Sequence, residues 1–199
     1  MTPQFKLYRI QFPVLSWLLL RFMLRVRLTG LENIPKDGAF IVTAEHTSNF
    51  DPFIMMYVFG KEHHIHILTK AEAFRAPLIG SVLRGVGMIC VDRSTNDISA
   101  VRQSLEYLKR GEKLGIFPEG RRIREGEAAD AKLGAVRFAS ATGAPILPLY
   151  IPKKKRLFRR TPIVIGEPYF VNPERRRLTA EEYRPLAAEV MERIRSLKP

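Results

Sequence analysis

The chain has 199 residues, which is enough for one well-buried core and short for two. Apolar residues make up 46 % of it and charged residues 27 %, a balance that excludes an intrinsically disordered chain. Lys and Arg number 33 against 20 Asp and Glu, and this net charge of +13 favours a polyanionic partner such as nucleic acid, anionic lipid headgroups or a phosphorylated substrate.

The N-terminal segment, from Phe5 to Arg27, has the composition of a helix lying at a membrane surface. The stretch from Phe12 to Leu20 carries no charge but covers only nine residues, whereas crossing a bilayer takes about 20, and no small-residue cleavage site for a signal peptide follows it. Apolar side chains nearly encircle the segment, and basic residues stand near its ends. The alternative is a core-packing helix. We expect residues 1–28 to form an amphipathic membrane-interfacial helix and residues 29–199 to form the main domain.

From residue 38 onward, short apolar runs alternate with stretches of helical periodicity. The apolar runs are continuous rather than alternating, so we expect an α/β fold with a mostly parallel central sheet of about six or seven strands, flanked by helices. The expected strands are 40–44, 65–69, 87–91, 114–117, 146–151 and 161–165. The expected helices begin near residues 51, 98, 133 and 179, and a further one is expected over residues 73–84. The only cysteine, Cys90, falls in the third strand, and its apolar neighbours predict a buried side chain rather than a nucleophile.

Several helix ends carry recognisable signals. Asn96 or Asp97 is expected to cap the third helix, and a capping box of Thr179 and Glu182 opens the last one. Pro185 stands just past that first turn, which predicts a kink or a later start. The basic run 153–160 is expected to be a loop between the last two strands.

A His and an Asp follow the first of these strands, where active sites of open α/β sheets collect. His46 and Asp51 can meet only if the chain turns between them, and Thr47-Ser48-Asn49 supplies turn chemistry for that. A His held by a carboxylate is a general base, because the Asp orients the ring and stabilises the imidazolium. No Gly-x-Ser-x-Gly nucleophile motif occurs, so the base would act directly on a substrate hydroxyl. The alternative is a capped turn with an incidental His.

Cationic residues follow three further strands. Lys70 follows the second, Arg93 the third and Arg122 the fourth, where it stands in the run Phe117-Pro118-Glu119-Gly120-Arg121-Arg122. Guanidinium groups can fork onto phosphate or carboxylate oxygens, and Gly120 lets the backbone approach a ligand closely. Each cation alone is typical of a solvated surface, but their shared position indicates an anion site beside the His-Asp turn.

These motifs together resemble the glycerolipid acyltransferase family, most closely its lysophosphatidate (1-acylglycerol-3-phosphate) acyltransferases. His46 and Asp51 match the family's His-x4-Asp motif. Residues 70–93, 117–122 and 144–149 resemble its other three blocks, in the family's order. A His-x4-Asp match alone is weak, whereas four ordered blocks are specific.

The resemblance implies a glycerol-3-phosphate acyltransferase-like fold, with His46 as the base and Asp51 as its orienter. Acyl would pass from an acyl thioester, acyl-CoA or acyl-ACP, to lysophosphatidate, with no cofactor and no metal; another lysolipid or glycerol-3-phosphate is the alternative acceptor. The implied substrate-binding residues are Lys70, Arg93, Glu119, Gly120 and Arg122, with Pro145 and Pro148 near the acyl chain. The family usually has Thr-Arg-Ser after Phe-Pro-Glu-Gly, and here Arg121-Arg122-Ile123 replaces it.

Other interpretations of the same sequence are weaker. His63, His64 and His66 could suggest a metal site, but no Cys lies near and Glu62 is the only adjacent carboxylate. A basic nucleic-acid-binding protein fits the charge, but the cations are dispersed and no base-reading motif appears. A membrane-anchoring protein without catalysis has no need of a His-Asp pair. We therefore expect a peripheral or monotopic enzyme on the cytoplasmic face of an anionic membrane, with no nucleic-acid partner.

Overall fold

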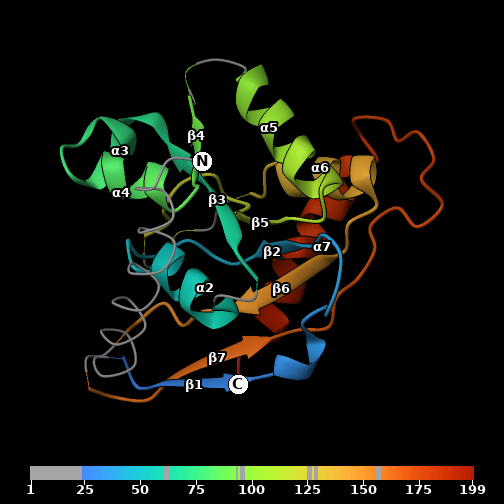
Figure 1. Cartoon of the computed structure of the whole chain (residues 1–199). Helices are drawn as coiled ribbons and strands as arrows, with labels where there is room; N and C mark the ends of the chain where they lie inside the picture. Colours follow the sequence, from blue (N-terminus) through green and yellow to red (C-terminus); the bar gives the residue numbers. More distant parts are fainter. Residues whose placement is uncertain are drawn as a thin grey trace.

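The computed structural model describes residues 24–60, 63–92, 94, 97–124, 127, 130–155 and 158–199. Its strands form one sheet of seven in the order β1-β7-β6-β2-β5-β3-β4 (Figure 1). All neighbouring pairs are parallel apart from β6 and β7. The strands are β1 (Val26–Thr29), β2 (Ile41–Thr43), β3 (Ile65–Lys70), β4 (Ile89–Val91), β5 (Lys113–Ile116), β6 (Ile146–Tyr150) and β7 (Thr161–Ile165). The expected mostly parallel sheet is confirmed.

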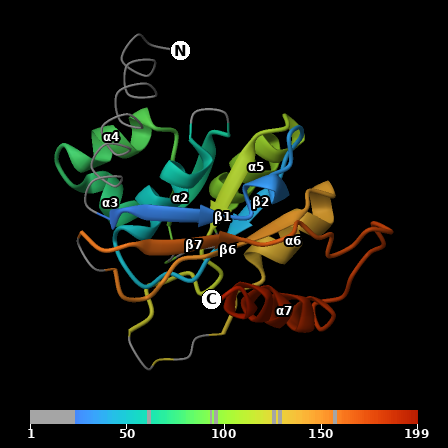
Figure 2. The same cartoon turned by 90° about the horizontal axis from the view of Figure 1, so that it is seen from below.

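Helices cover both faces of this sheet. They are η1 (Leu31–Asn33), α2 (Asp51–Phe59), α3 (Ala71–Arg75), α4 (Ile79–Gly85), α5 (Ile98–Lys109), α6 (Gly134–Thr142) and α7 (Tyr183–Ser196). The buried residues of α2, α3 and α4 belong to one apolar cluster, and those of α5, α6 and α7 belong to the other. In Figure 2, α2 and α7 accordingly lie on opposite sides of the strands.

The central strand β2 shows why its residues form a strand buried on both faces. Ile41 packs into the cluster under α5, α6 and α7, whereas Val42 packs into the cluster under α2. Both side chains are 0 % exposed, and full burial of such a side chain stabilises a fold by about 1.5–3 kcal/mol. The continuous apolar run is therefore the signature of a strand with a helical layer on either side.

The segment expected as one helix over 73–84 is two helices, α3 and α4, and this expectation was wrong. Pro77 lies between them, and the residue before a proline is pushed out of the helical region. Ala76 accordingly adopts an extended conformation, with φ −66° and ψ 131°. Leu78 follows with a positive φ of 63°, so the chain turns sharply before α4 begins.

Two other local expectations were also wrong. Residues Val26–Thr29 form strand β1, paired in parallel with β7, so the helix predicted over 1–28 cannot extend through Leu28. Cys90 is exposed rather than buried, and the strand that carries it, β4, is at the edge of the sheet. The rejection of Cys90 as a nucleophile agrees with its electrostatics, since partial burial and the carboxylates Asp97 and Asp92 raise the thiol pKa.

The helix ends agree with their sequence signals. The Asp97 side chain accepts a hydrogen bond from the N–H of Ala100 and caps α5. Thr179 and Glu182 form both bonds of the capping box, yet α7 begins only at Tyr183. The later start, one of the two outcomes predicted from Pro185, is therefore the one observed.

The predicted N-terminal interfacial helix lies outside the described residues over 1–23. Among the helices that the structure does describe, none combines the length and the apolar character needed to cross a bilayer.

Candidate active site

The site lies where the connections of two adjacent strands diverge. β2 and β5 are hydrogen-bonded neighbours, with Thr43 opposite Ile116 at their carboxyl ends. The chain leaves β2 toward α2 on one face of the sheet and leaves β5 toward α6 on the other. Such a divergence opens a crevice at the carboxyl ends of parallel strands, which is where ligands bind in open α/β sheets.

His46 and Asp51 meet across the turn between β2 and α2, as their spacing predicted. His46 Nδ1 lies 3.2 Å from Asp51 Oδ2, and the side chains are 15 % and 0 % exposed. Nδ1 therefore donates to the carboxylate, which leaves Nε2 as the basic nitrogen of the ring. The His46 ring stacks on Phe117, the first residue after β5, with centroids 4.3 Å apart.

The turn is built around the Asp51 carboxylate. The backbone N–H groups of Thr47 and Ser48 each donate to Asp51 Oδ2 at 2.7 Å. The other oxygen, Oδ1, lies 2.6 Å from Lys155 Nζ. Burial opposes ionisation of Asp51, but the bonds from His46 and Lys155 outweigh it and hold the pKa of Asp51 below its ordinary value. Asp51 is thus a charged group that orients His46.

Glu119 does not occupy the place that the sequence predicted for it. It is 3 % exposed and lies behind His46, where its Oε1 accepts a hydrogen bond from the His46 backbone N–H at 3.2 Å. No described residue gives its Oε2 a hydrogen bond. Burial raises the pKa of Glu119 to about 7, and nearby Glu45 adds to the effect. Glu119 therefore supports the backbone of the site and does not line the substrate pocket, because the turn after Pro118 directs its side chain inward.

A cleft of about 1740 Å³ opens in front of His46 and has two unlike walls. One wall, from α2, β3, α3, α4 and β4, is largely apolar: Phe53, Ile67, Leu68, Ala73, Ile79, Leu83, Met88 and Val91. The other wall, from the connections that follow β5 and β6, is cationic: Arg121, Arg122, Arg124, Lys132, Lys153 and Lys154. An amphiphile with an anionic headgroup matches these two walls, with His46 between them.

The predicted substrate-binding residues are only partly brought together. Lys70, Gly120 and Arg122 line the cleft with His46, whereas Arg93 lies outside the described residues. Neither Pro145 nor Pro148 lines it: Pro148 lies opposite Thr43 within the sheet, and the Pro145 carbonyl accepts from Ile41 N–H.

The unusual Arg121 has a local explanation. Its guanidinium pairs with Glu127, and Glu127 also accepts from the Arg124 backbone N–H, so Arg121 helps to hold the loop after β5. Arg122 forms no ion pair with a described residue and is exposed at the cleft. Arg121, which stands where the family usually has Thr, therefore supports the loop that carries Arg122.

Sequence reasoning missed Lys132 and Lys155. Lys132 lies across Gly120: an added Cβ at Gly120 would come 2.8 Å from Lys132 Cδ, and Gly120 has a φ of +66°. The sequence predicted that Gly120 would let the backbone approach a ligand closely, and in the structure the group that approaches it is the Lys132 side chain. Both lysines lie far from His46 in the sequence and carry no local motif, and only the folded chain brings them near it.

The chain is similar to known acyltransferases. Residues 25–152 match the family model described as Acyltransferase. The chain is 33 % identical over 148 residues to a 1-acyl-sn-glycerol-3-phosphate acyltransferase of Bacillus subtilis, covering 72 % of this chain and 73 % of that protein. It is also 33 % identical over 137 residues to one of Borreliella burgdorferi, covering 68 % of this chain. The chain spans only 54 % of the length of that Borreliella relative.

A solved structure extends this likeness to almost the whole chain. The 1-acyl-sn-glycerophosphate (LPA) acyltransferase PlsC from Thermotoga maritima superposes with a TM-score of 0.69 at 28 % identity, covering 97 % of this chain and 78 % of that chain. The resemblance seen in the four sequence blocks is thereby confirmed. With its His46–Asp51 turn at the carboxyl end of β2, this chain belongs to the acyltransferase family, on the side of its 1-acylglycerol-3-phosphate acyltransferases.

Proposed function

We propose that this chain transfers a fatty acyl group from an acyl thioester to the free hydroxyl of lysophosphatidate, which gives phosphatidate in phospholipid biosynthesis. The observation that carries the proposal is the His46–Asp51 pair between an apolar and a cationic wall. The names of the relatives from Bacillus and Borreliella, both 1-acyl-sn-glycerol-3-phosphate acyltransferases, support the choice of acceptor.

The geometry supports a direct transfer without an acyl-enzyme. His46 Nε2 takes the proton of the acceptor hydroxyl while that oxygen attacks the thioester carbonyl. The charge that forms on the ring is stabilised by Asp51, 3.2 Å away. Collapse of the tetrahedral intermediate breaks the carbon–sulfur bond, and the leaving thiolate takes the proton back from His46.

Each wall of the cleft has a part in this reaction. The acceptor phosphate binds on the cationic wall, where Arg122 and Lys132 supply charge-assisted hydrogen bonds and Lys70 assists from the end of β3. The sequence also predicts Arg93 as a ligand of this phosphate, from its place after β4. Acyl chains lie against the apolar wall, where Leu83 and Met88 provide burial.

The donor in this proposal is acyl-CoA or acyl-ACP, both of which present an acyl thioester. The basic cleft mouth suits either one, since the phosphates of coenzyme A and the surface of acyl carrier protein are both anionic. No cofactor takes part in the chemistry described.

We place the enzyme on the cytoplasmic face of the membrane as a peripheral or monotopic protein. The composition of residues 1–28 supports this, and so does the rim of the cleft. Leu78 and Ile79 are 85 % and 57 % exposed, and Ile79 also lines the cleft. Phe50 is 52 % exposed and stands between the cleft residues Asn49 and Pro52. Apolar side chains around a cationic opening are typical of a surface that meets anionic lipid.

The direct test of function is an assay of the purified full chain against several acceptors. Lysophosphatidate, glycerol-3-phosphate and an uncharged lysolipid analogue are each offered with acyl-CoA and with acyl-ACP of the same chain length. We expect transfer to lysophosphatidate to be fastest and to require the phosphate. No thioester turnover on any acceptor, together with tight binding of duplex DNA, would favour the nucleic-acid-binding alternative.

The membrane proposal is tested by sedimentation with vesicles. Deleting residues 1–23, which leaves strand β1 in place, should release the protein from anionic vesicles. In the full-length chain, Leu78→Gln combined with Ile79→Gln should weaken binding to the same vesicles. If all these variants sedimented with vesicles as the wild type does, neither the N-terminal segment nor the apolar rim would be needed for membrane binding.

A further inference from the structure

Lys155 is a buried lysine that touches the catalytic turn from a distant part of the chain. Its side chain is 6 % exposed, and its Nζ lies 2.6 Å from Asp51 Oδ1 and 3.0 Å from Thr47 Oγ1. It stands in the connection between β6 and β7, beyond residues 25–152 that match the family model. Lys155 therefore lies outside the four sequence blocks.

The two oxygens of Asp51 have different partners. Oδ2 receives N–H groups from His46, Thr47 and Ser48, whereas Oδ1 is held by Lys155. Because both oxygens are occupied, the carboxylate cannot rotate without breaking a bond on each side. A buried ammonium and a buried carboxylate each carry a large desolvation cost, so removal of one partner leaves the other strongly disfavoured.

The connection between β6 and β7 also contacts Glu45, on the other side of His46 from Asp51. Lys153 Nζ lies 3.6 Å from Oε2 of Glu45, the residue that precedes His46. Glu45 Oε1 also accepts from Arg195 Nε of α7 at 2.9 Å. Two lysines, Lys153 and Lys155, thus hold the carboxylates that flank His46. The basic run 153–160, predicted from the sequence to be a loop, thus also contacts residues of the site.

We propose that Lys155 is a positioning residue of the acyl-transfer site, which locks the Asp51 carboxylate in place and, by partly neutralising it, sets the pH at which His46 becomes available as a base. The inference rests on the proposed function, because the availability of His46 is read through acyl transfer. Lys155 acts through Asp51 and not on the substrate: it does not line the cleft.

The electrostatics of the pair give the sign of the effect. A cation beside Asp51 makes the carboxylate a weaker stabiliser of the imidazolium, so its removal favours the protonated ring. The other groups facing the pair are unchanged by a substitution at Lys155. They are Glu45 before the turn, Glu119 and Arg122 after β5, Lys70 at the end of β3, Lys132 before α6, Lys153 after β6 and Arg195 on α7.

The test is the pH profile of kcat/KM for Lys155→Met beside the matched control Lys109→Met, which is an exposed position at the end of α5. We expect Lys155→Met to lower the plateau about tenfold and to move the acidic limb up by about one pH unit, and Lys109→Met to change neither. Lys155→Arg should restore part of both effects. A lower plateau with an unmoved limb would make Lys155 merely structural and would overturn the proposal.

A second measurement does not depend on turnover. The midpoint of the NMR titration of the His46 ring should move to higher pH in Lys155→Met, and this move should vanish when both proteins also carry Asp51→Asn. An unmoved midpoint in protein that melts cooperatively would overturn the role of Lys155. Absence of thioester turnover by the wild type, with the titration shift present, would instead defeat the proposed function and leave the positioning role standing.

Discussion

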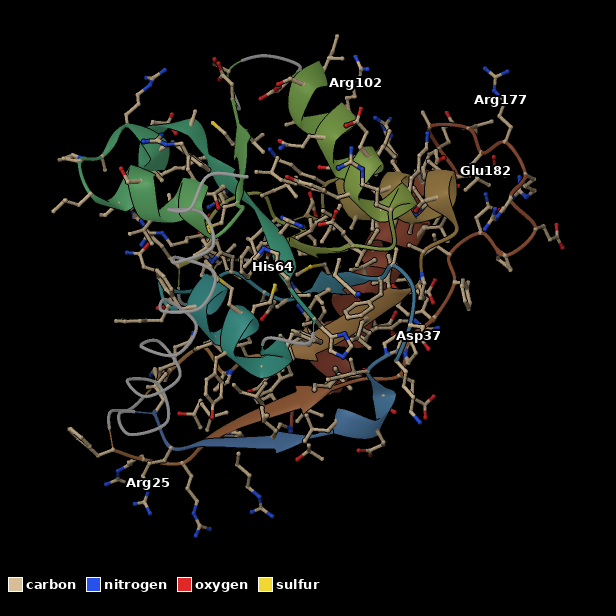
Figure 3. All side chains as sticks on the ribbon, in the orientation of Figure 1. Arg25, Asp37, His64, Arg102, Arg177 and Glu182 are labelled. Carbon is tan, nitrogen blue, oxygen red and sulfur yellow. The ribbon has the colours of Figure 1, made fainter. Side chains whose placement is uncertain are left out.

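Two histidine–carboxylate pairs lie at opposite ends of the strands, and they differ in whether a ring nitrogen is left open to the cleft. His46 follows the carboxyl end of β2 and is bonded to Asp51 through Nδ1 alone, with no described residue bonded to Nε2. His66 lies near the start of β3. Its Nε2 is 2.7 Å from Glu112 Oε2, and its Nδ1 is 2.6 Å from the carbonyl oxygen of Gly87. The rings of Tyr107 and His64 enclose it, and His64 is labelled near the centre of Figure 3.

The difference shows that a carboxylate partner does not by itself make a catalytic histidine. Both ring nitrogens of His66 already have protein partners, one a carboxylate and the other a backbone carbonyl, so neither is open to a substrate. His66 is a structural cross-link that ties β3 to β5 and to the turn before β4. His46 keeps one basic nitrogen directed to a cleft with a cationic wall, and that free nitrogen is what distinguishes it.

Replacing each histidine by alanine gives the largest expected contrast. His46→Ala should lower acyl transfer by a factor of about 100 to 10,000 while the protein still melts cooperatively. His66→Ala should leave turnover per folded molecule within about twofold but lower the free energy of unfolding by about 2–4 kcal/mol, because it leaves a cavity and two unpaired acceptors. Steady-state kinetics and denaturant unfolding measure the two effects. Equal losses of activity in both variants would contradict the assignment of His46 as the base and His66 as a structural residue.

The arginines of the cleft give the next contrast. Arg122→Ala should raise the KM for lysophosphatidate about tenfold with little change in kcat, because a charge-assisted bond to the phosphate is lost. Arg121→Ala should raise it less, since the Arg121 guanidinium is already paired with Glu127. Initial-rate kinetics over acceptor concentration check this order. A larger rise in KM for Arg121→Ala would mean that Arg121, and not Arg122, is the main ligand of the phosphate.

Glu119, behind His46, has an expected effect on stability that depends on pH. Its pKa in the folded protein is about 7 against an ordinary 4.5, so its contribution is lost as the pH rises between these values. Glu119→Gln, which stays neutral, should therefore gain up to about 3 kcal/mol relative to the wild type between pH 5 and pH 8. Urea unfolding at several pH values measures the gain, and a difference independent of pH would refute it.

A glycine beside each pair gives the smallest contrast. An added Cβ at Gly87, where φ is +74°, would approach the His64 and His66 rings at 3.1–3.2 Å. Gly87→Ala should cost about 1–2 kcal/mol of stability without changing KM. Gly120→Ala should cost a similar amount and also raise KM, because it displaces Lys132 at the cleft. Thermal melting and acceptor kinetics check both variants. An unchanged KM in Gly120→Ala would remove Lys132 from the phosphate site.

The elements that the sequence predicted are those whose determinants are local. Continuous apolar runs identified β2, β3, β5, β6 and β7, and the capping residue Asp97 identified the start of α5. The His46–Asp51 contact was predictable because only a turn separates the residues. Pro77 was visible too, and its restriction on the residue before it would have predicted the break between α3 and α4.

The features that were missed depend on contacts between distant segments. β1 is a strand only because β7 offers it a partner edge, and its residues were assigned to a helix on composition. Cys90 is exposed on β4, the edge strand, and neither the place of a strand in the sheet nor what covers its faces can be read from strand periodicity. Lys153 and Lys155 belong to a basic run, and basic residues of a loop usually point into solvent, as Arg25 and Arg177 do in Figure 3. Only the folded chain shows that these two lysines contact Glu45 and Asp51 instead.

The pairing of β1 with β7 also orders events during synthesis. Val26 leaves the ribosome early, but its partner Thr161 follows only after most of the domain has been made. At the usual pace of translation that delay is roughly 10 s or longer, and the long loop it must close is entropically slow to form. The strands from β2 to β6 can assemble first around Val42, so β1 is expected to be the last strand to join the sheet.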